Sequence, residues 1–287
     1  MTPLSAALVS FVTLAGPGSA ALAFTPSSAA AQSEKDLLAD FKETFGSSDP
    51  FARATAVTTL GDKSLSLPDQ GSGKRVAQAL VKGLEDRELE VCAASIFQLV
   101  RGREVETTIG ALTPFLQQYY REIADKVESS DPYARNFVER ATVAFENAGY
   151  VLANYKDDRS VAVLVTLLGG LKADTKKNHF GSLLIGALAG ANLELGTETA
   201  VETAVKLTKI FSLPAQSDGA KKLHDALSAF ATKKGMTPPE WNDAYSEQWF
   251  AWFEANRNQL PKKLGRLTAP PTGDASQPLG GLPGKNG

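Results

Sequence analysis

A seven-residue motif that occurs twice constrains the fold of this 287-residue chain more than any other feature. Residues 47–53 read SSDPFAR and residues 129–135 read SSDPYAR, identical except for one aromatic exchange, at an offset of 82. Half of that offset is roughly 41 residues, and a degenerate copy near the midpoint begins at Glu88, where small and apolar residues follow at the same spacings. The sequence therefore predicts an array of repeats, each about 40 residues long.

Both copies are typical of the start of a helix. The aspartate is placed to accept hydrogen bonds from the free N–H groups of the first turn, and the proline suits the first helical position, where its missing N–H costs nothing. The arginine, four residues after the aspartate, can pair with it or with a neighbouring repeat. We interpret these residues as structural, fixing helix starts and the spacing between repeats: Asp49, Pro50, Arg53, Asp131, Pro132 and Arg135.

Apolar residues at helical spacing fill the rest of the chain, and no useful strand-like alternation appears. Stripes at residues 76–84 and 161–168 predict the partner helices of the motif helices, and further helices are expected over 180–191, 197–211, 218–233 and 238–258. Pro114 falls inside an apolar run, so we expect a break or kink there. In total the sequence predicts an all-α protein of about eleven helices in five to six pairs.

The pattern D-P-x-A-R-x-x-A-x-x-x-L-G over residues 49–61, with V-x-x-x-L-V-x-x-L-x-D over residues 76–86, resembles a HEAT repeat. The resemblance is explicit over residues 47–172 and rests on helical periodicity alone to about residue 260. Cys92 stands where the motif usually has Arg, which loosens the repeat boundaries. The resemblance implies a HEAT/armadillo-like solenoid, a right-handed α-α superhelix that is elongated and curved.

The two ends of the chain differ from this unit. Residues 1–33 contain no charged side chain, residues 4–15 are mostly apolar, and A-x-A cleavage patterns lie at 21–23 and 29–31. We predict a signal peptide over 1–31 that lacks a basic n-region, export to the periplasm or beyond, and no membrane span in the mature chain. An uncleaved disordered leader on a cytoplasmic protein is the alternative. Five Pro and six Gly predict a disordered tail over 261–287, which leaves 33–260 as the solenoid.

Composition disfavours several function classes. Lys plus Arg number 30 against 32 Asp plus Glu, so the balance offers no field that would attract nucleic acid. One Cys and two His leave little from which to build a metal site. We expect no catalytic residue, no cofactor, no metal and no nucleic-acid partner.

All three Trp lie within twelve residues near the end of the predicted solenoid. The preceding sequence Thr-Pro-Pro-Glu at 237–240 has the form of a capping box and predicts a helix start there. One interpretation is a terminal cap that seals the last repeat. The other is a partner-binding site, since exposed Trp and Tyr are enriched among interface anchors. Its candidate residues are Trp241, Tyr245, Trp249, Phe250 and Trp252.

The leading hypothesis is a non-enzymatic, exported HEAT-type scaffold that binds a protein or peptide along its concave surface. A HEAT-like enzyme or enzyme-accessory protein, such as a lyase, is a second class, because the fold alone does not exclude chemistry. A passive structural component of the cell envelope is the third.

Overall fold

The structure is a computed structural model that describes residues 33–67, 72–101, 104–171, 178–211 and 217–266. Within these residues the protein is all-α, with eleven α-helices and no strand, which confirms the predicted all-α class and the predicted number of helices. None of these helices has both the length and the apolar character needed to cross a membrane. The predicted signal peptide and the chain after residue 266 lie outside the described residues.

In chain order the α-helices are α1 (Glu34–Phe45), α2 (Pro50–Ser64), α3 (Ser72–Val81), α4 (Leu89–Arg101), α5 (Val105–Lys126), α6 (Pro132–Tyr155), α7 (Asp158–Gly169), α8 (Asn178–Leu195), α9 (Glu198–Ile210), α10 (Ser217–Lys233) and α11 (Tyr245–Asn256). Two short 3-10 helices, η1 (Lys82–Glu85) and η3 (Arg257–Gln259), follow α3 and α11.

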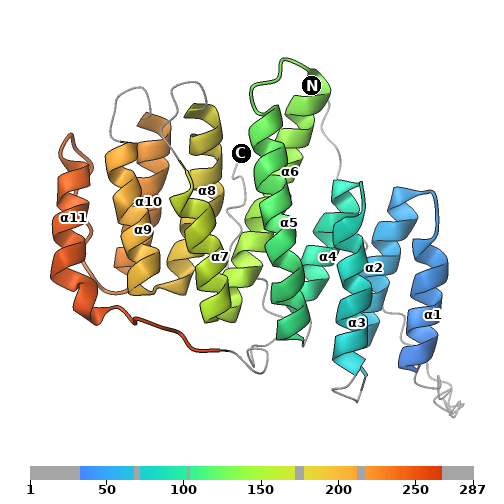
Figure 1. The fold of residues 1–287 in the computed structure, drawn as a ribbon. Coiled ribbons are helices and arrows are strands. Elements are labelled where there is room, and N and C mark those ends of the chain that lie inside the picture. The colour runs from blue at the N-terminus through green and yellow to red at the C-terminus, as the bar shows by residue number, and fades with distance from the viewer. Residues whose placement is uncertain (1–32, 68–71, 102–103, 172–177, 212–216, 267–287) are drawn as a thin grey trace, which may run out of the picture. The chain divides into compact units, whose positions relative to one another are not determined.

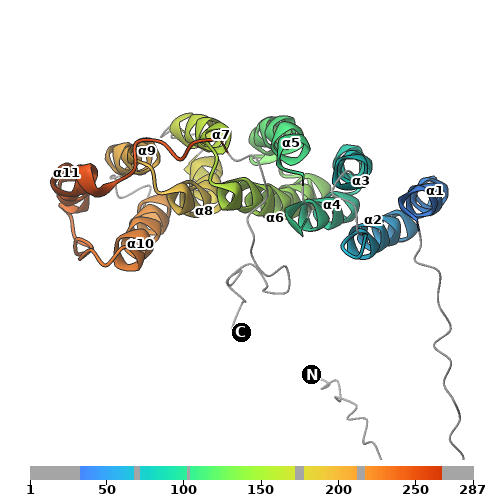
Figure 2. The ribbon, with the colours of Figure 1, turned by 90° about the horizontal axis from the view of Figure 1, so that it is seen from below.

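The helices form two layers according to whether their number is odd or even (Figures 1 and 2). The even-numbered helices α2, α4, α6, α8 and α10 pack one against the next, and α3, α5, α7, α9 and α11 do the same on the other side. Every pair of α-helices in extensive contact is adjacent in the chain or separated by one helix. Each helix therefore buries its apolar face against near neighbours only.

The repeated motif forms the same local structure in both copies. Asp49 is the N-cap of α2 and accepts from the N–H of Phe51 at 3.0 Å, while Asp131 caps α6 and accepts from the N–H of Tyr133 at 3.0 Å. Pro50 and Pro132 are the first residues of these helices. The acidic caps satisfy backbone donors that the helix itself leaves without partners.

The two arginines of the motif differ in their surroundings. Arg53 is buried and donates to both carboxylate oxygens of Asp86, at 2.6 and 2.9 Å, and also to the carbonyls of Ser47 and Ser48. Arg135 is exposed and donates to the carbonyl of Ser130 at 2.9 Å. Arg53 thus joins the start of α2 to the end of η1, whereas Arg135 contacts only the turn that precedes α6.

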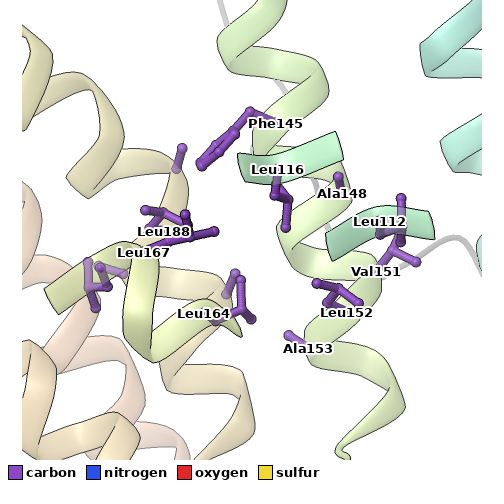
Figure 3. Close-up of a cluster of buried hydrophobic side chains, with 14 of the residues drawn as sticks. Leu112, Leu116, Phe145, Ala148, Val151, Leu152, Ala153, Leu164, Leu167 and Leu188 are labelled. Carbon is purple, nitrogen blue, oxygen red and sulfur yellow. The ribbon is translucent and has the colours of Figure 1, made fainter. Parts of the chain in front are cut away.

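The centre of the core lies between α5, α6, α7 and α8 (Figure 3). Leu116, Phe145, Leu152 and Leu164 are fully buried there. The helix α5 runs without a break through Pro114, so the predicted break is absent. Pro114 has no N–H, so the carbonyl of Gly110, one turn earlier, receives no helical hydrogen bond. Both residues are exposed, so water can donate to that carbonyl instead.

The helix predicted to begin at the Thr-Pro-Pro-Glu sequence begins at Tyr245 instead. Pro238 precedes a second proline, and a residue before proline is driven out of the helical region. Asn242 forms the turn that starts α11, accepting from the N–H of Ala244 at 2.9 Å through its side chain. The indole of Trp252 donates to the carbonyl of Thr237 at 3.0 Å and holds the non-helical segment against α11.

Residues 260–266 form an extended segment, the C-terminal strap, which runs back beneath α9 towards α7 (Figure 1). The carbonyl of Pro261 accepts from the first N–H of α9 at 2.9 Å, and that of Gly265 accepts from the first N–H of α7 at 3.0 Å. Arg266 then pairs with Glu106 near the start of α5. Residues 261–266, which the sequence analysis assigned to the start of a disordered tail, therefore contact the helical unit.

The two motif arginines allow a matched test. Arg53→Ala leaves the carboxylate of Asp86 poorly exposed and without its bidentate partner, whereas Arg135→Ala removes only an exposed side chain. We expect Arg53→Ala to lower the thermal midpoint several times more than Arg135→Ala, measured by circular dichroism. Equal effects would contradict the structural role of the Arg53 ion pair.

Candidate partner-binding surface

The large apolar side chains that stay exposed gather on the even-numbered helices. Phe51 on α2 is 79% exposed and Phe97 on α4 is 57% exposed, while α6 carries Tyr133 at 86% and Val143 at 57%. Within the described residues no odd-numbered helix carries such a side chain. We call the outward side of α2, α4, α6, α8 and α10 the even face.

A fifth exposed apolar residue, Trp241, extends this set beyond α10. It is 43% exposed and lies between α10 and α11. Its ring packs on His224 of α10 with the ring centroids 5.1 Å apart, and the ammonium of Lys221 lies 5.8 Å from its centre. Trp241 therefore lies against the last even-numbered helix.

Ion pairs bridge successive even-numbered helices. Asp62 of α2 pairs with Arg101 at the end of α4, and Glu90 of α4 pairs with Arg140 of α6. Further along, Glu194 of α8 pairs with Lys233 of α10 at 2.7 Å. These contacts are partly solvent-exposed, so each adds little to stability.

The aromatic residues singled out in the sequence have different environments. Tyr245, Trp249 and Trp252 are buried, which removes them from the side chains that can touch a partner directly. Phe250 is half-buried beneath the ammonium of Lys209, 4.1 Å from the ring centre. Trp241 alone of the five is exposed. The cluster is thus mainly the packing of α11 against α9 and α10, with one indole exposed to solvent.

His224 is the buried polar centre of this cluster. Its Nδ1 accepts from the indole N–H of Trp249 at 3.0 Å, and its Nε2 lies 3.3 Å from the hydroxyl of Ser228. An indole N–H can only donate, so the imidazole must keep a free lone pair on Nδ1. Burial lowers the pKa of His224, and the nearby charge of Lys221 lowers it further against the opposing effect of Asp225.

The one cysteine belongs to the core. Cys92 is fully buried, its thiol contacts the carbonyl of Asp86 at 3.2 Å, and the hydroxyl of Tyr119 lies 3.8 Å away. Burial raises the pKa of Cys92 to about 11. The thiolate is therefore disfavoured at neutral pH, which is unlike the environment of a nucleophilic cysteine.

Phe97, Val143 and the exposed aromatic residues of the motif were not predicted from the sequence as surface residues. A signal for Phe97 was present: Cys92, Ile96 and Leu99 form the buried stripe of α4, and helical spacing places residue 97 away from it. Nothing similar marks Phe51 or Tyr133, because the second residue of a helix can face the core or solvent depending on the neighbouring repeat.

No protein-family model matches this chain, and no curated protein matches it.

The lowered pKa of His224 predicts a specific pH dependence. As the pH falls below about 6.5, the unfolded chain takes up a proton that the folded imidazole does not, so stability is lost until the pH reaches the lower pKa of the folded state. We expect the thermal midpoint to fall between pH 7.5 and pH 5. In His224→Gln, whose amide oxygen can still accept from Trp249, this fall should be smaller; an unchanged slope would show that His224 is not its source.

Proposed function

We propose that this chain is a HEAT-type α-solenoid that acts as a non-catalytic scaffold and binds a protein or peptide partner along its even face. The observation that carries the proposal is the placement of exposed apolar side chains: Phe51, Phe97, Tyr133 and Val143 all lie on even-numbered helices. Exposed apolar side chains gathered on one face of a soluble protein mark interaction sites.

The packing pattern supports the solenoid part of the proposal. Helices in contact are near neighbours in the chain, as expected where each repeat packs only on the next. The motif glycine Gly61 fits the same scheme, because a Cβ there would collide with the side chain of Gln98 on α4. Gly61 thus permits the close approach of α2 to the following even-numbered helix.

The terminal helices argue against an assembly that grows by stacking end to end. The helix α1 exposes Lys42 and Glu43, and α11 exposes Glu247 and Glu254. Polar outer faces on the first and last helices are the mark of capped arrays. The proposal therefore places the binding surface on the even face and not at the ends.

Site-specific photo-crosslinking tests this placement. A photoreactive amino acid replaces Phe97 on the even face in one variant and Gln117, which is exposed on α5, in the other. Both variants are irradiated in envelope extract of the source cell, because the sequence predicts export. We expect Phe97 to give a discrete adduct with a protein and Gln117 to give none; adducts from Gln117 alone would place the partner on the odd-numbered layer and overturn the proposal.

A further inference from the structure

Ion pairs join each even-numbered helix to the next along the even face, with one exception. Pairs bridge α2 to α4, α4 to α6 and α8 to α10, but none bridges α6 to α8 among the described residues. The helices α6 and α8 are nevertheless in extensive contact. The gap coincides with Glu146, a carboxylate on the outward side of α6.

Glu146 lies in a single outward stripe of α6. Arg140, Val143, Glu146 and Tyr150 follow one another at intervals of three or four residues and are all unburied, whereas the residues between them include the buried Phe145 and Ala148. Glu146 itself is half-buried. Within the described part of the chain it has neither an ion pair nor a hydrogen bond, although most acidic side chains of the even face have a cationic partner.

Among the described side chains of the opposing helix α8, residues 180–195, none is cationic. Gly190 of α8 lies against the hydroxyl of Tyr150, so closely that a Cβ would collide with it. Gly186, one turn earlier, is exposed. The nearest lysine of α10 that touches this region, Lys222, has its carbon chain beside Gly186 and its ammonium paired with Asp218 at 3.1 Å.

Apolar side chains flank Glu146. The contacts between Glu90 and Arg140 and between the carbonyl of Leu99 and the hydroxyl of Tyr155 show that α4 and α6 run parallel. Counted from the Glu90 and Arg140 pair, Phe97 lies roughly 10 Å along α4 and Glu146 roughly 9 Å along α6, by the rise of 1.5 Å per residue. Counted from the contact between Leu99 and Tyr155, Phe97 is level with residue 153 instead, so the two contacts place Phe97 on the neighbouring helix roughly 1.5 to 10 Å beyond Glu146.

This arrangement has an energetic cost. Burial raises the pKa of Glu146, and the negative charges of Glu146 and Glu194 add to burial in raising the pKa of Tyr150. A half-buried carboxylate without a partner destabilises the folded chain. A residue that lowers stability and makes no compensating contact is often retained for a function. A single carboxylate is too few ligands for a metal ion, and the described residues hold no group of three or more His, Cys, Asp or Glu suited to one.

We propose that Glu146 is the site at which the even face recognises a Lys or Arg side chain of its partner, with an adjacent apolar side chain of that partner packing on Phe97 and Val143. The partner's cation would supply Glu146 with the ion pair that no described side chain of α8 provides. This inference rests on the proposed function, because it specifies what kind of segment the even face binds: a basic residue flanked by an apolar one.

A displayed library of random twelve-residue peptides tests the recognition. The full chain is the bait, with Glu146→Gln, Phe97→Ala and Glu139→Gln as variants; Glu139 lies on the same helix, is exposed and serves as the matched control. We expect enriched peptides to carry Lys or Arg beside an apolar residue. Their binding should weaken at least tenfold in Glu146→Gln and Phe97→Ala and stay unchanged in Glu139→Gln.

Two other outcomes separate the inference from the proposed function. Peptides that need Phe97 but lack a basic residue, or that ignore Glu146→Gln, overturn the role of Glu146 and leave the even face as the binding surface. A library that yields no peptide dependent on either residue overturns both.

A measurement of the melting temperature shows whether Glu146→Gln weakens binding only because the chain has unfolded. Glu146→Gln should melt at the same temperature as the parent chain or higher, because it removes an unpaired, partly desolvated charge. A fall in the melting temperature would assign Glu146 a structural role and overturn the inference.

Discussion

Near-neighbour packing is the constraint on which the rest of this structure depends. Each helix buries its apolar face against helices one or two places away in the chain, so stability is built up locally along the array. Such an array needs fixed helix starts, fixed spacing and sealed ends. The aspartate caps supply the first, the Arg53 ion pair with Asp86 contributes to the second, and the exposed polar side chains of α1 and α11 contribute to the third.

The C-terminal strap is an exception to this local rule. Its carbonyls cap the first N–H groups of α9 and α7, and Arg266 reaches Glu106, which precedes it in the chain by 160 residues. These contacts tie together the starts of three odd-numbered helices. The even-numbered layer has no such strap among the described residues, and its outward side is where the exposed apolar side chains and the unpaired Glu146 lie.

Local rules explain why the sequence predicted the fold class. Helical spacing of apolar residues and the two Asp-Pro motifs indicated the helices, and the structure has them. The two failures have different causes. The late helix start at Tyr245 follows from local features, namely Pro238 before a second proline and the turn at Asn242. The strap depends on contacts with helix starts more than 50 residues away.

The candidate surface was harder to predict than the fold. The five aromatic residues chosen from the sequence form one cluster, yet only Trp241 is exposed, because α11 turns Tyr245, Trp249 and Trp252 inward against its neighbours. Glu146 carries no signal in the sequence at all. Its significance comes from its being half-buried without a partner where most carboxylates of the even face have one, which only a three-dimensional arrangement shows.

Native-state hydrogen exchange, read by mass spectrometry helix by helix, tests near-neighbour packing most directly. The account predicts that α1, α2 and α3 open at a lower free energy than α5, α7 and α9, which the strap joins. Removing residues 261–287 should lower the opening free energy of α7 and α9, while removing only 267–287 should not. A single opening free energy for all helices, insensitive to both truncations, would contradict it.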